Sequence, residues 1–227
     1  MRIYWIILVA VATLLLLICL HPPETLPQSQ GYVKLPPPEY ESETSVEEAI
    51  LKRQSVREYL PEPLTLKELS QLLWAAQGIT HDGKRAAPSA GALYPLTVYV
   101  VVGDVTGLES GLYEYIPETH ELVRLSRGDL REDVYEAALY QPWVKNAPID
   151  LIIAANYSRT TQRYGERGVR YVHMEAGHVS ENVYLQAVSL GLGTVCVGAF
   201  YDERLREILG ISEDPVSYTH LTLPTKA

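Results

Sequence analysis

The sequence predicts one folded domain that contains both helices and strands. A chain of 227 residues with 47% apolar residues can bury one sizeable core and leaves little room for a second full domain. Several segments begin with helix-capping residues and continue with apolar residues at a spacing of three to four. Other segments are apolar runs bounded by turn residues, which predict strands.

Helices are predicted wherever a capping pattern precedes a periodic apolar face. Ser45 with Glu48, and Thr65 with Glu68, form capping-box patterns, and the two helices should end near Gln54 and Gly78. Further helices are expected over 129–140, over most of 160–190 and over 202–209.

Strands are predicted over 96–102 and 149–155, where the apolar runs are nearly continuous. The segments 111–116 and 121–125 flank a four-residue connection and predict a hairpin. The last expected strand covers 193–198.

The segment 3–20 is apolar and carries no charge. Its length of eighteen residues is about the minimum for a helix that crosses a bilayer. We expect 1–20 to be a membrane anchor or signal segment, with the uncleaved anchor preferred because no small-residue cleavage site follows. Arg2 would keep the amino end in the cytoplasm and the domain outside it. The alternatives are a lipoprotein, with Cys19 as the lipidated residue, and a cytoplasmic protein.

The segment 21–44 is rich in proline and polar residues and predicts an extended linker between the membrane and the domain. An arm that wraps a dimer partner is the alternative.

The stretch 85–96, RAAPSAGALYPL, is the part of the chain that core building explains least. Its small side chains allow backbone N–H groups to approach a flat ligand or a phosphate closely, and Pro88 fixes the backbone. The stretch predicts a cofactor cradle. The alternative is a surface loop that leads into a strand.

A second polar cluster follows the first predicted helix. Arg53, Gln54, Ser55 and Arg57 offer two guanidinium groups, an amide and a hydroxyl within five residues. Guanidinium groups bind phosphate oxygens bidentately, so this segment predicts an anion site. The alternative is a solvated charged face.

Together with GLGTVCVGAF at 191–200, the motifs PSAGALYP and RQSVREY resemble the nitroreductase superfamily of flavin enzymes, specifically its SagB/ThcOx-type dehydrogenase branch. The resemblance covers about 46–210, and we assign 45–214 to a nitroreductase-like FMN-binding domain. It implies an α+β fold with a central, mostly antiparallel sheet flanked by helices. It also implies an intertwined homodimer, with FMN at the dimer interface and the helix 160–190 at its centre.

The resemblance implies three groups of FMN-binding residues. They are Arg53, Gln54, Ser55 and Arg57; Pro88, Ser89, Ala90 and Gly91; and Val197, Gly198 and Ala199. The last group is expected beside the reacting edge of the flavin, where a small residue leaves room for hydride transfer. Arg163 and Tyr164 are the implied substrate-pocket residues, and no catalytic acid or base is assigned.

The carboxyl-terminal tail, 215–227, departs from the family pattern. Its only charged residue is Lys226, and threonine dominates it. We interpret it as an atypical, non-native ending, and we assign no phosphate contact to Lys226.

Composition excludes other classes of function. The net charge is −9 and the cations are scattered, so no nucleic-acid partner is expected. His173 and His178 are five residues apart, whereas metal ligands on one helix are typically four apart, so no metal site is predicted.

The predicted function is therefore an FMN-dependent oxidoreductase, with NAD(P)H as a further candidate co-substrate. The substrate is either a modified peptide or a small molecule such as a nitro compound. The alternative is a membrane-tethered flavin-binding or interaction domain without catalysis.

Overall fold

The computed structural model describes residues 31–211, 216–222 and 225–226. Its centre is a seven-stranded sheet in the order β1-β6-β5-β3-β7-β10-β9, and every neighbouring pair in it is antiparallel. The strands are β1 (Tyr32–Lys34), β3 (Leu96–Val102), β5 (Gly111–Ile116), β6 (Glu121–Arg127), β7 (Ile149–Asn156), β9 (Cys196–Val197) and β10 (Val216–Thr222). The predicted mostly antiparallel sheet is confirmed.

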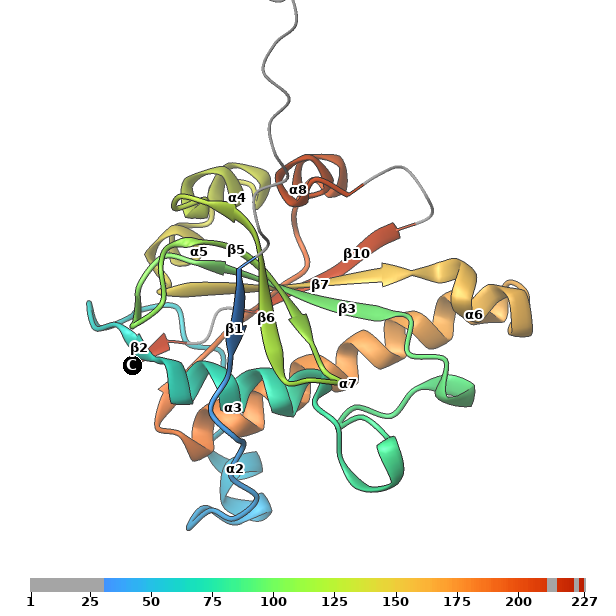
Figure 1. The fold of residues 1–227 in the computed structure, drawn as a ribbon, viewed down its shortest axis with the longest axis horizontal. Helices are drawn as coiled ribbons and strands as arrows, with labels where there is room; N and C mark the ends of the chain where they lie inside the picture. Colours follow the sequence, from blue (N-terminus) through green and yellow to red (C-terminus); the bar gives the residue numbers. More distant parts are fainter. Residues whose placement is uncertain (1–30, 212–215, 223–224, 227) are drawn as a thin grey trace, which may run out of the picture. The chain divides into compact units, whose positions relative to one another are not determined.

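Helices cover both faces of this sheet (Figure 1). One layer holds α2 (Val46–Lys52), α3 (Leu66–Gln77) and the long α7 (Arg167–Ser189). The opposite layer holds α4 (Arg131–Ala137), α5 (Pro142–Asn146) and α8 (Asp202–Leu209). The remaining elements are α6 (Tyr157–Tyr164), two short 3₁₀ helices at His81–Gly83 and Ala90–Ala92, and the short strands β2 (Leu64–Thr65), β4 (Val105–Thr106), β8 (Leu192–Gly193) and β11 (Thr225–Lys226).

The alternation of side chains along β3 builds two cores. Val98, Val100 and Val102 face the layer of α3 and α7, while Tyr99 and Val101 face α4, α5 and α8. Successive residues of a strand point to opposite faces, and a strand buried on both faces therefore reads as a continuous apolar run. This is why 96–102 carries no polar alternation.

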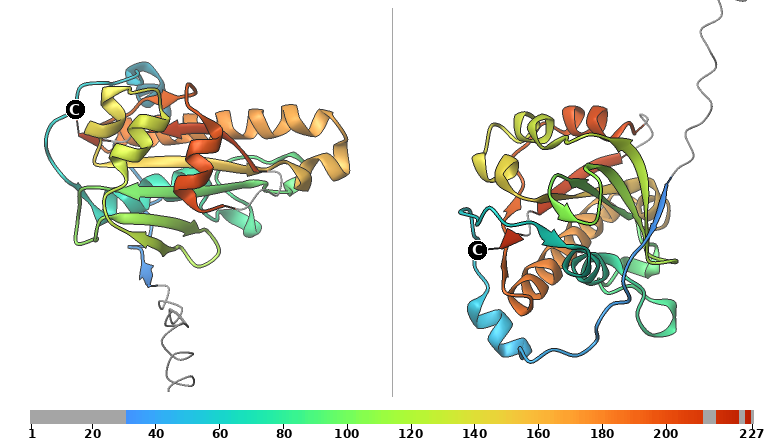
Figure 2. Two further views of the ribbon diagram at one scale, coloured as in Figure 1. Left: turned by 90° about the horizontal axis from the view of Figure 1, so that it is seen from above. Right: turned by 60° about the vertical axis from the view of Figure 1, so that its left-hand side comes forward.

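The two predicted capping boxes begin helices in the structure. Ser45 accepts a hydrogen bond from the backbone of Glu48, and Thr65 and Glu68 cap each other reciprocally. The helix expected over 160–190 is divided into α6 and α7 by Gly165, which has a φ of +59°. Gly165 removes the cost of that backbone conformation, so the chain turns back on itself between the two helices (Figure 2).

The segment from Gly31 to Thr44 belongs to the domain and is not a free linker. β1 pairs with β6 at the edge of the sheet, and Leu35 is buried. The side chain of Gln71 exchanges hydrogen bonds of 2.8 and 2.9 Å with the backbone of Glu39. The compact unit therefore begins at Gly31, ahead of the predicted boundary at Ser45.

The tail contributes backbone to the sheet. β10 lies between β7 and β9, and β11 pairs with β8. The tail that the sequence marks as atypical therefore forms an internal strand of the central sheet.

The predicted membrane-anchored localisation is corrected. Within the described ranges, no helix is both long enough and apolar enough to cross a bilayer. The expected span at 3–20 lies outside the described residues. The anchored localisation is therefore not retained.

Candidate functional site

The structure gathers the predicted cofactor residues into two groups, which we call the arginine half-site and the cradle half-site. The arginine half-site comprises Arg53, Gln54, Ser55, Arg57, Val197, Gly198 and Ala199. The cradle half-site comprises Pro88, Ser89, Ala90, Gly91, Arg163 and Tyr164.

Tyr184 of α7 organises the arginine half-site. Its hydroxyl lies 2.9 Å from the hydroxyl of Ser55 and accepts a hydrogen bond of 2.8 Å from the backbone N–H of Cys196. The guanidinium of Arg53 lies over the Tyr184 ring, 5.2 Å from its centroid. One buried tyrosine thus joins the loop after α2 to the strand β9.

The backbone strengthens the same connection. The N–H of Val56 donates to the carbonyl of Thr194 at 2.9 Å, which fixes the RQSVR loop beside the GTVCVGA segment. Gln54 lines a cavity of about 180 Å³ between these segments and α7. Two predicted motifs more than a hundred residues apart in sequence therefore lie side by side.

The segment 141–148, which the structure folds around the short helix α5, contributes Trp143, a residue with no sequence signal for this role. The guanidinium of Arg57 lies over its ring, 5.3 Å from the centroid, and Gln141 of the same loop donates to the carbonyl of Ala199 at 2.9 Å. The indole N–H of Trp143 is buried and has no hydrogen-bond partner among the described residues. Cation–π contact holds the guanidinium without neutralising its charge.

The arginine half-site keeps free positive charge and open space. Among the residues that the structure describes, neither Arg53 nor Arg57 forms an ion pair with a carboxylate. Gly198 is exposed, and a Cβ atom added to it would meet nothing within 4 Å. By contrast, Val197 turns its side chain into the second core.

The cradle half-site is a tight turn held by internal hydrogen bonds. The hydroxyl of Ser89 accepts from the backbone N–H of Tyr94 at 2.9 Å, and Gly91 has a φ of +64°. A Cβ atom on Gly91 would lie 2.6 Å from the hydroxyl of Tyr164 and 2.9 Å from Nη1 of Arg163. The backbone conformation therefore favours glycine at 91, and the two nearby atoms are the ends of flexible side chains that pack against it.

Arginines of α6 hold the carbonyl groups of the cradle. Nη1 of Arg159 donates to the carbonyl of Tyr94 at 3.1 Å, and Nη1 of Arg163 donates to the carbonyl of Gly91 at 3.5 Å. The sequence analysis expected Arg163 and Tyr164 near the flavin, and the structure brings both against the predicted cradle.

Glu175 lies beneath the cradle. Its side chain is 2% exposed, and burial raises the pKa of this carboxyl to about 7, against the opposing influences of a hydrogen bond from Ser89 and the charge of Arg85. The Oε1 atom has no hydrogen-bond partner in the described part of the chain. Glu175 therefore supports the turn from below and is largely neutral under mildly acidic conditions.

The two half-sites contact α7 at different heights and on different sides. Ser89 reaches Glu175, and Ser55 reaches Tyr184 nine residues later. At 1.5 Å and 100° per residue, these positions are separated by about 14 Å along the axis and by about 180° around it. The two half-sites therefore contact α7 at well-separated positions.

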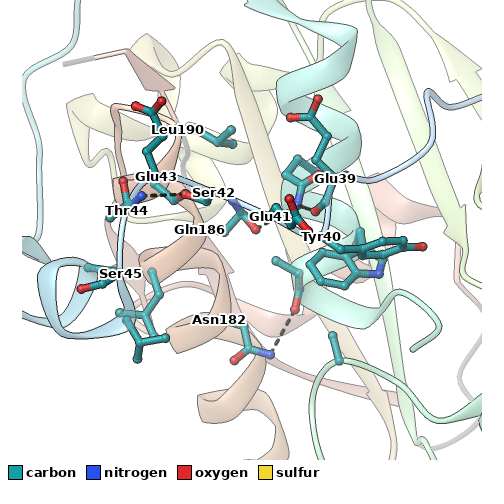
Figure 3. Close-up of a pocket in the computed structure, with 18 of the residues that line it drawn as sticks. Glu39, Tyr40, Glu41, Ser42, Glu43, Thr44, Ser45, Asn182, Gln186 and Leu190 are labelled. Carbon is teal, nitrogen blue, oxygen red and sulfur yellow. Dashed lines mark hydrogen bonds between the residues drawn. The ribbon is translucent and has the colours of Figure 1, made fainter. Parts of the chain in front are cut away.

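A larger cavity, of about 740 Å³, lies between the segment 39–46, α3 and the second half of α7 (Figure 3). Asn182 donates to the carbonyl of Ala75 at its wall, and Glu39, Glu41 and Glu43 line it. None of the predicted cofactor residues lines this cavity. Its carboxylates disfavour a phosphate-bearing ligand, so size alone does not make it the cofactor site.

His173 of α7 contacts a tyrosine of α6. Nε2 of His173 lies 2.6 Å from the hydroxyl of Tyr157, and the two rings meet edge to face. Within the described residues, no group of three or more histidine, cysteine, aspartate or glutamate side chains is arranged to hold a metal ion.

Comparison with known proteins identifies the family. The model of the nitroreductase family matches residues 50–222, and the chain therefore belongs to the nitroreductase family. Dimers are typical of this family.

Two named relatives agree with this assignment. A Methanocaldococcus jannaschii protein that is provisionally named a nitroreductase is 58% identical over 175 residues, which cover 77% of this chain and 88% of that protein. The trifolitoxin-processing protein TfxB of Rhizobium leguminosarum is 34% identical over 115 residues, covering 48% of this chain and 31% of that protein.

Solved structures show the same fold. A provisionally named nitroreductase of Ralstonia eutropha has a TM-score of 0.77 at 32% identity, covering 92% of this chain and 95% of that chain. Another, of Anabaena variabilis, has a TM-score of 0.77 at 28% identity, covering 87% of this chain but only 42% of that chain.

Proposed function

We propose that this chain is an FMN-dependent oxidoreductase that transfers hydride between the N5 atom of FMN and an organic substrate. The observation that carries the proposal is the arginine half-site, where two guanidinium groups without carboxylate partners lie in the same half-site as the open backbone of Gly198. A phosphate-bearing, flat cofactor needs both features.

The residues present fit FMN chemically. Arg53 and Arg57 are the candidate phosphate and ring-edge contacts, and both retain guanidinium N–H groups that no described carboxylate occupies. Ser89, Ala90 and Gly91 offer a turn in which small side chains leave the backbone accessible. Gly198 leaves the space that a flavin ring edge would require.

The proposal requires a second copy of the chain. Because the two half-sites contact α7 about 14 Å apart and on opposite sides of it, we infer that they close around different ligands. In a twofold dimer, the arginine half-site of one protomer can meet the cradle half-site of its partner. This arrangement is in keeping with the dimers typical of the family.

Bound FMN supplies the hydride chemistry, and the chain supplies position and charge. Arginine at the ring edge stabilises negative charge that develops there, and it acts most strongly where water is excluded. Trp143 contacts the guanidinium of the exposed Arg57 and fixes its position. Arg163 and Tyr164, held against Gly91, are the proposed substrate-side residues.

Within the family, we propose membership of the SagB/ThcOx-type branch, whose substrates are azoline rings in modified peptides. The support is the motif PSAGALYP and the 34% identity with a protein named for the processing of trifolitoxin. Reduction of nitro compounds is the second candidate, supported by the name of the Methanocaldococcus relative.

The test is FMN binding followed by hydride transfer in the purified full-length chain. We expect the protein to bind FMN. The variant Arg53→Gln should bind FMN about 10- to 100-fold more weakly, because this is the change in affinity that corresponds to the free energy of one charge-assisted hydrogen bond. Arg127→Gln is the matched control, because Arg127 is an exposed arginine of β6. Equal affinities of both variants would contradict the proposed site.

The reaction is tested with FMN-loaded protein that has been photoreduced without oxygen. Reoxidation of the bound cofactor by a nitroaromatic compound or by an azoline-containing peptide would support the enzyme and select its substrate class. Reduction of bound FMN by NADH or NADPH would identify the electron donor. Tight FMN binding without any of these exchanges would favour the non-catalytic flavin-binding alternative.

A further inference from the structure

The tip formed by the end of α6 and the start of α7 carries an unusual concentration of positive charge. Between residues 159 and 170 the chain has four arginines (Arg159, Arg163, Arg167 and Arg170) and one acidic residue, Glu166, which gives a local charge of +3. The whole chain carries −9. The tip is therefore a cationic island on an acidic protein.

These arginines are exposed and lack acidic partners. Among the described residues, none of the four forms an ion pair, whereas Arg85, Arg124, Arg131, Arg204 and Arg206 each pair with a carboxylate. Arginines of like charge at helical spacing repel one another, so this arrangement does not stabilise the helices by charge. A ligand that brings negative charge would relieve the repulsion.

The tip adjoins the cradle directly. Arg159 and Arg163 each bond a cradle carbonyl, at Tyr94 and Gly91 respectively. They lie four residues apart and share one face of α6, while Arg167 and Arg170 share a face of α7. Gly165 and Glu166 join the two pairs, so cations extend from the cradle outwards over the turn.

Aromatic rings accompany the cations. The ring of Tyr164 meets that of Tyr171 edge to face at 5.2 Å, and the guanidinium of Arg163 lies 5.4 Å from the Tyr164 centroid. A surface with guanidinium forks and tyrosine rings suits a flat molecule that carries a carboxylate or phosphate group.

We propose that this cationic tip binds the anionic group of an organic substrate and orients the substrate toward the cradle, with Arg167 and Arg170 as specificity-determining residues. The inference rests on the proposed function, because the cradle matters only if it holds the flavin. The net charge of −9 repels anions from most of the protein surface. The positively charged tip therefore attracts an anionic molecule to this one place.

The first experiment measures binding and needs no turnover. Calorimetric titration of the FMN-loaded full-length protein with 4-nitrobenzoate and with its neutral analogue 4-nitrobenzamide should show at least tenfold tighter binding of the anion at low salt. This preference should decrease as ionic strength rises. Equal affinities for the two compounds would overturn the proposal.

The variants assign the effect to residues. In the double variant Arg167→Gln with Arg170→Gln, the ratio of the two affinities should fall at least tenfold, while Arg127→Gln should leave the ratio unchanged. A loss of structure would weaken both compounds together and would leave the ratio unchanged. In a double variant that keeps the native circular dichroism spectrum and binds the neutral compound normally, an unchanged ratio would overturn the assignment to the tip.

Two further experiments make two distinctions. One distinguishes a phosphate of the electron donor from a carboxylate of the oxidised substrate, and the other distinguishes failure of the binding inference from failure of the proposed function. A preference for NADPH over NADH that the double variant abolishes would assign the tip to a donor phosphate, whereas a carboxylate preference alone would assign it to the oxidised substrate. If the anion preference holds but reduced protein transfers no hydride, the proposed oxidoreductase function fails and the binding inference stands. If hydride transfer occurs equally to both nitro compounds and without salt dependence, the binding inference fails alone.

Discussion

At the scale of single residues, Tyr184 has the largest structural consequence for the candidate site. It is 8% exposed, and its hydroxyl connects Ser55 to the backbone of Cys196. This role is not visible in the sequence, because Tyr184 has the spacing of an ordinary core position on a long helix. Its importance follows from two partners that only the folded chain brings together.

Removal of this hydroxyl should therefore loosen the arginine half-site. In Tyr184→Phe, the N–H of Cys196 loses its acceptor, and we expect the free energy of unfolding to fall by about 1–3 kcal/mol. FMN affinity should fall as well. Urea unfolding and a flavin titration measure the two effects, with Tyr32→Phe as the control because Tyr32 is 66% exposed. No change in either quantity would contradict the role.

Glu175 makes a prediction about pH. Its folded pKa of about 7 lies above the usual value of 4.5 for glutamate, so the unfolded chain ionises this group first as pH rises. The stability of the native protein should consequently decrease between about pH 4.5 and 7, and Glu175→Gln should remove that decrease. At pH 8 the variant should be more stable than the native protein by on the order of 2 kcal/mol.

The measurement is the urea midpoint of both proteins at pH 5 and pH 8. Glu181→Gln, which changes an exposed residue of the same helix, is the control. If native protein and Glu175→Gln show the same pH dependence, the carboxyl does not carry the burial cost that we assign to it.

At the scale of elements, the contact between α6 and α7 depends on Gly168. A Cβ atom at this position would lie 2.8 Å from the Cα atom of Thr161, a backbone atom that cannot move alone. Gly177, on the same helix, has nothing within 4 Å of an added Cβ atom. The two glycines therefore differ in packing, although each lies inside α7.

Alanine substitutions should have opposite effects at these two positions. Gly168→Ala should destabilise the fold by about 1–3 kcal/mol through overpacking, whereas Gly177→Ala should stabilise it by up to about 1 kcal/mol through helix propensity. Chemical unfolding of both variants provides the comparison. Equal effects would show that the crossing of α6 and α7 is not tightly packed.

Elements with local signals were predictable from sequence, and elements that depend on distant partners were not. The caps at Ser45 and Thr65 begin helices as expected, because a cap involves only neighbouring residues. β1 was missed because its pairing with β6 spans about ninety residues and its flanking prolines resemble a linker. The break at Gly165 was missed although glycine is a common helix stop.

For the candidate site, the sequence predicts the cofactor motifs but does not predict which motifs share a half-site. Arg53, Ser55 and Gly198 fall together only because Tyr184 and β9 join them. Trp143 and Arg159 were not identified, since neither lies in a recognisable motif. Their roles arise from contacts with Arg57 and with the carbonyl of Tyr94.

At the scale of the whole molecule, the central claim is that FMN binds between two protomers. Each protomer carries one arginine half-site and one cradle half-site on opposite sides of α7, so a dimer would contain two composite sites. A defect in one half-site can then be complemented by a partner that carries the other defect.

Complementation between two variants is the most direct measurement of this claim. Arg53→Gln damages the arginine half-site, and Gly91→Val damages the cradle half-site by forcing a branched side chain against Tyr164 and into a positive φ. Homodimers of either variant should bind FMN weakly at both sites.

When the two variants are co-expressed with different tags and the mixed dimer is purified, one of its two sites should be intact. We expect about half the native FMN content in the mixed dimer, with native affinity. An FMN content as low as that of the parent variants, or tight FMN binding by a monomer, would contradict it.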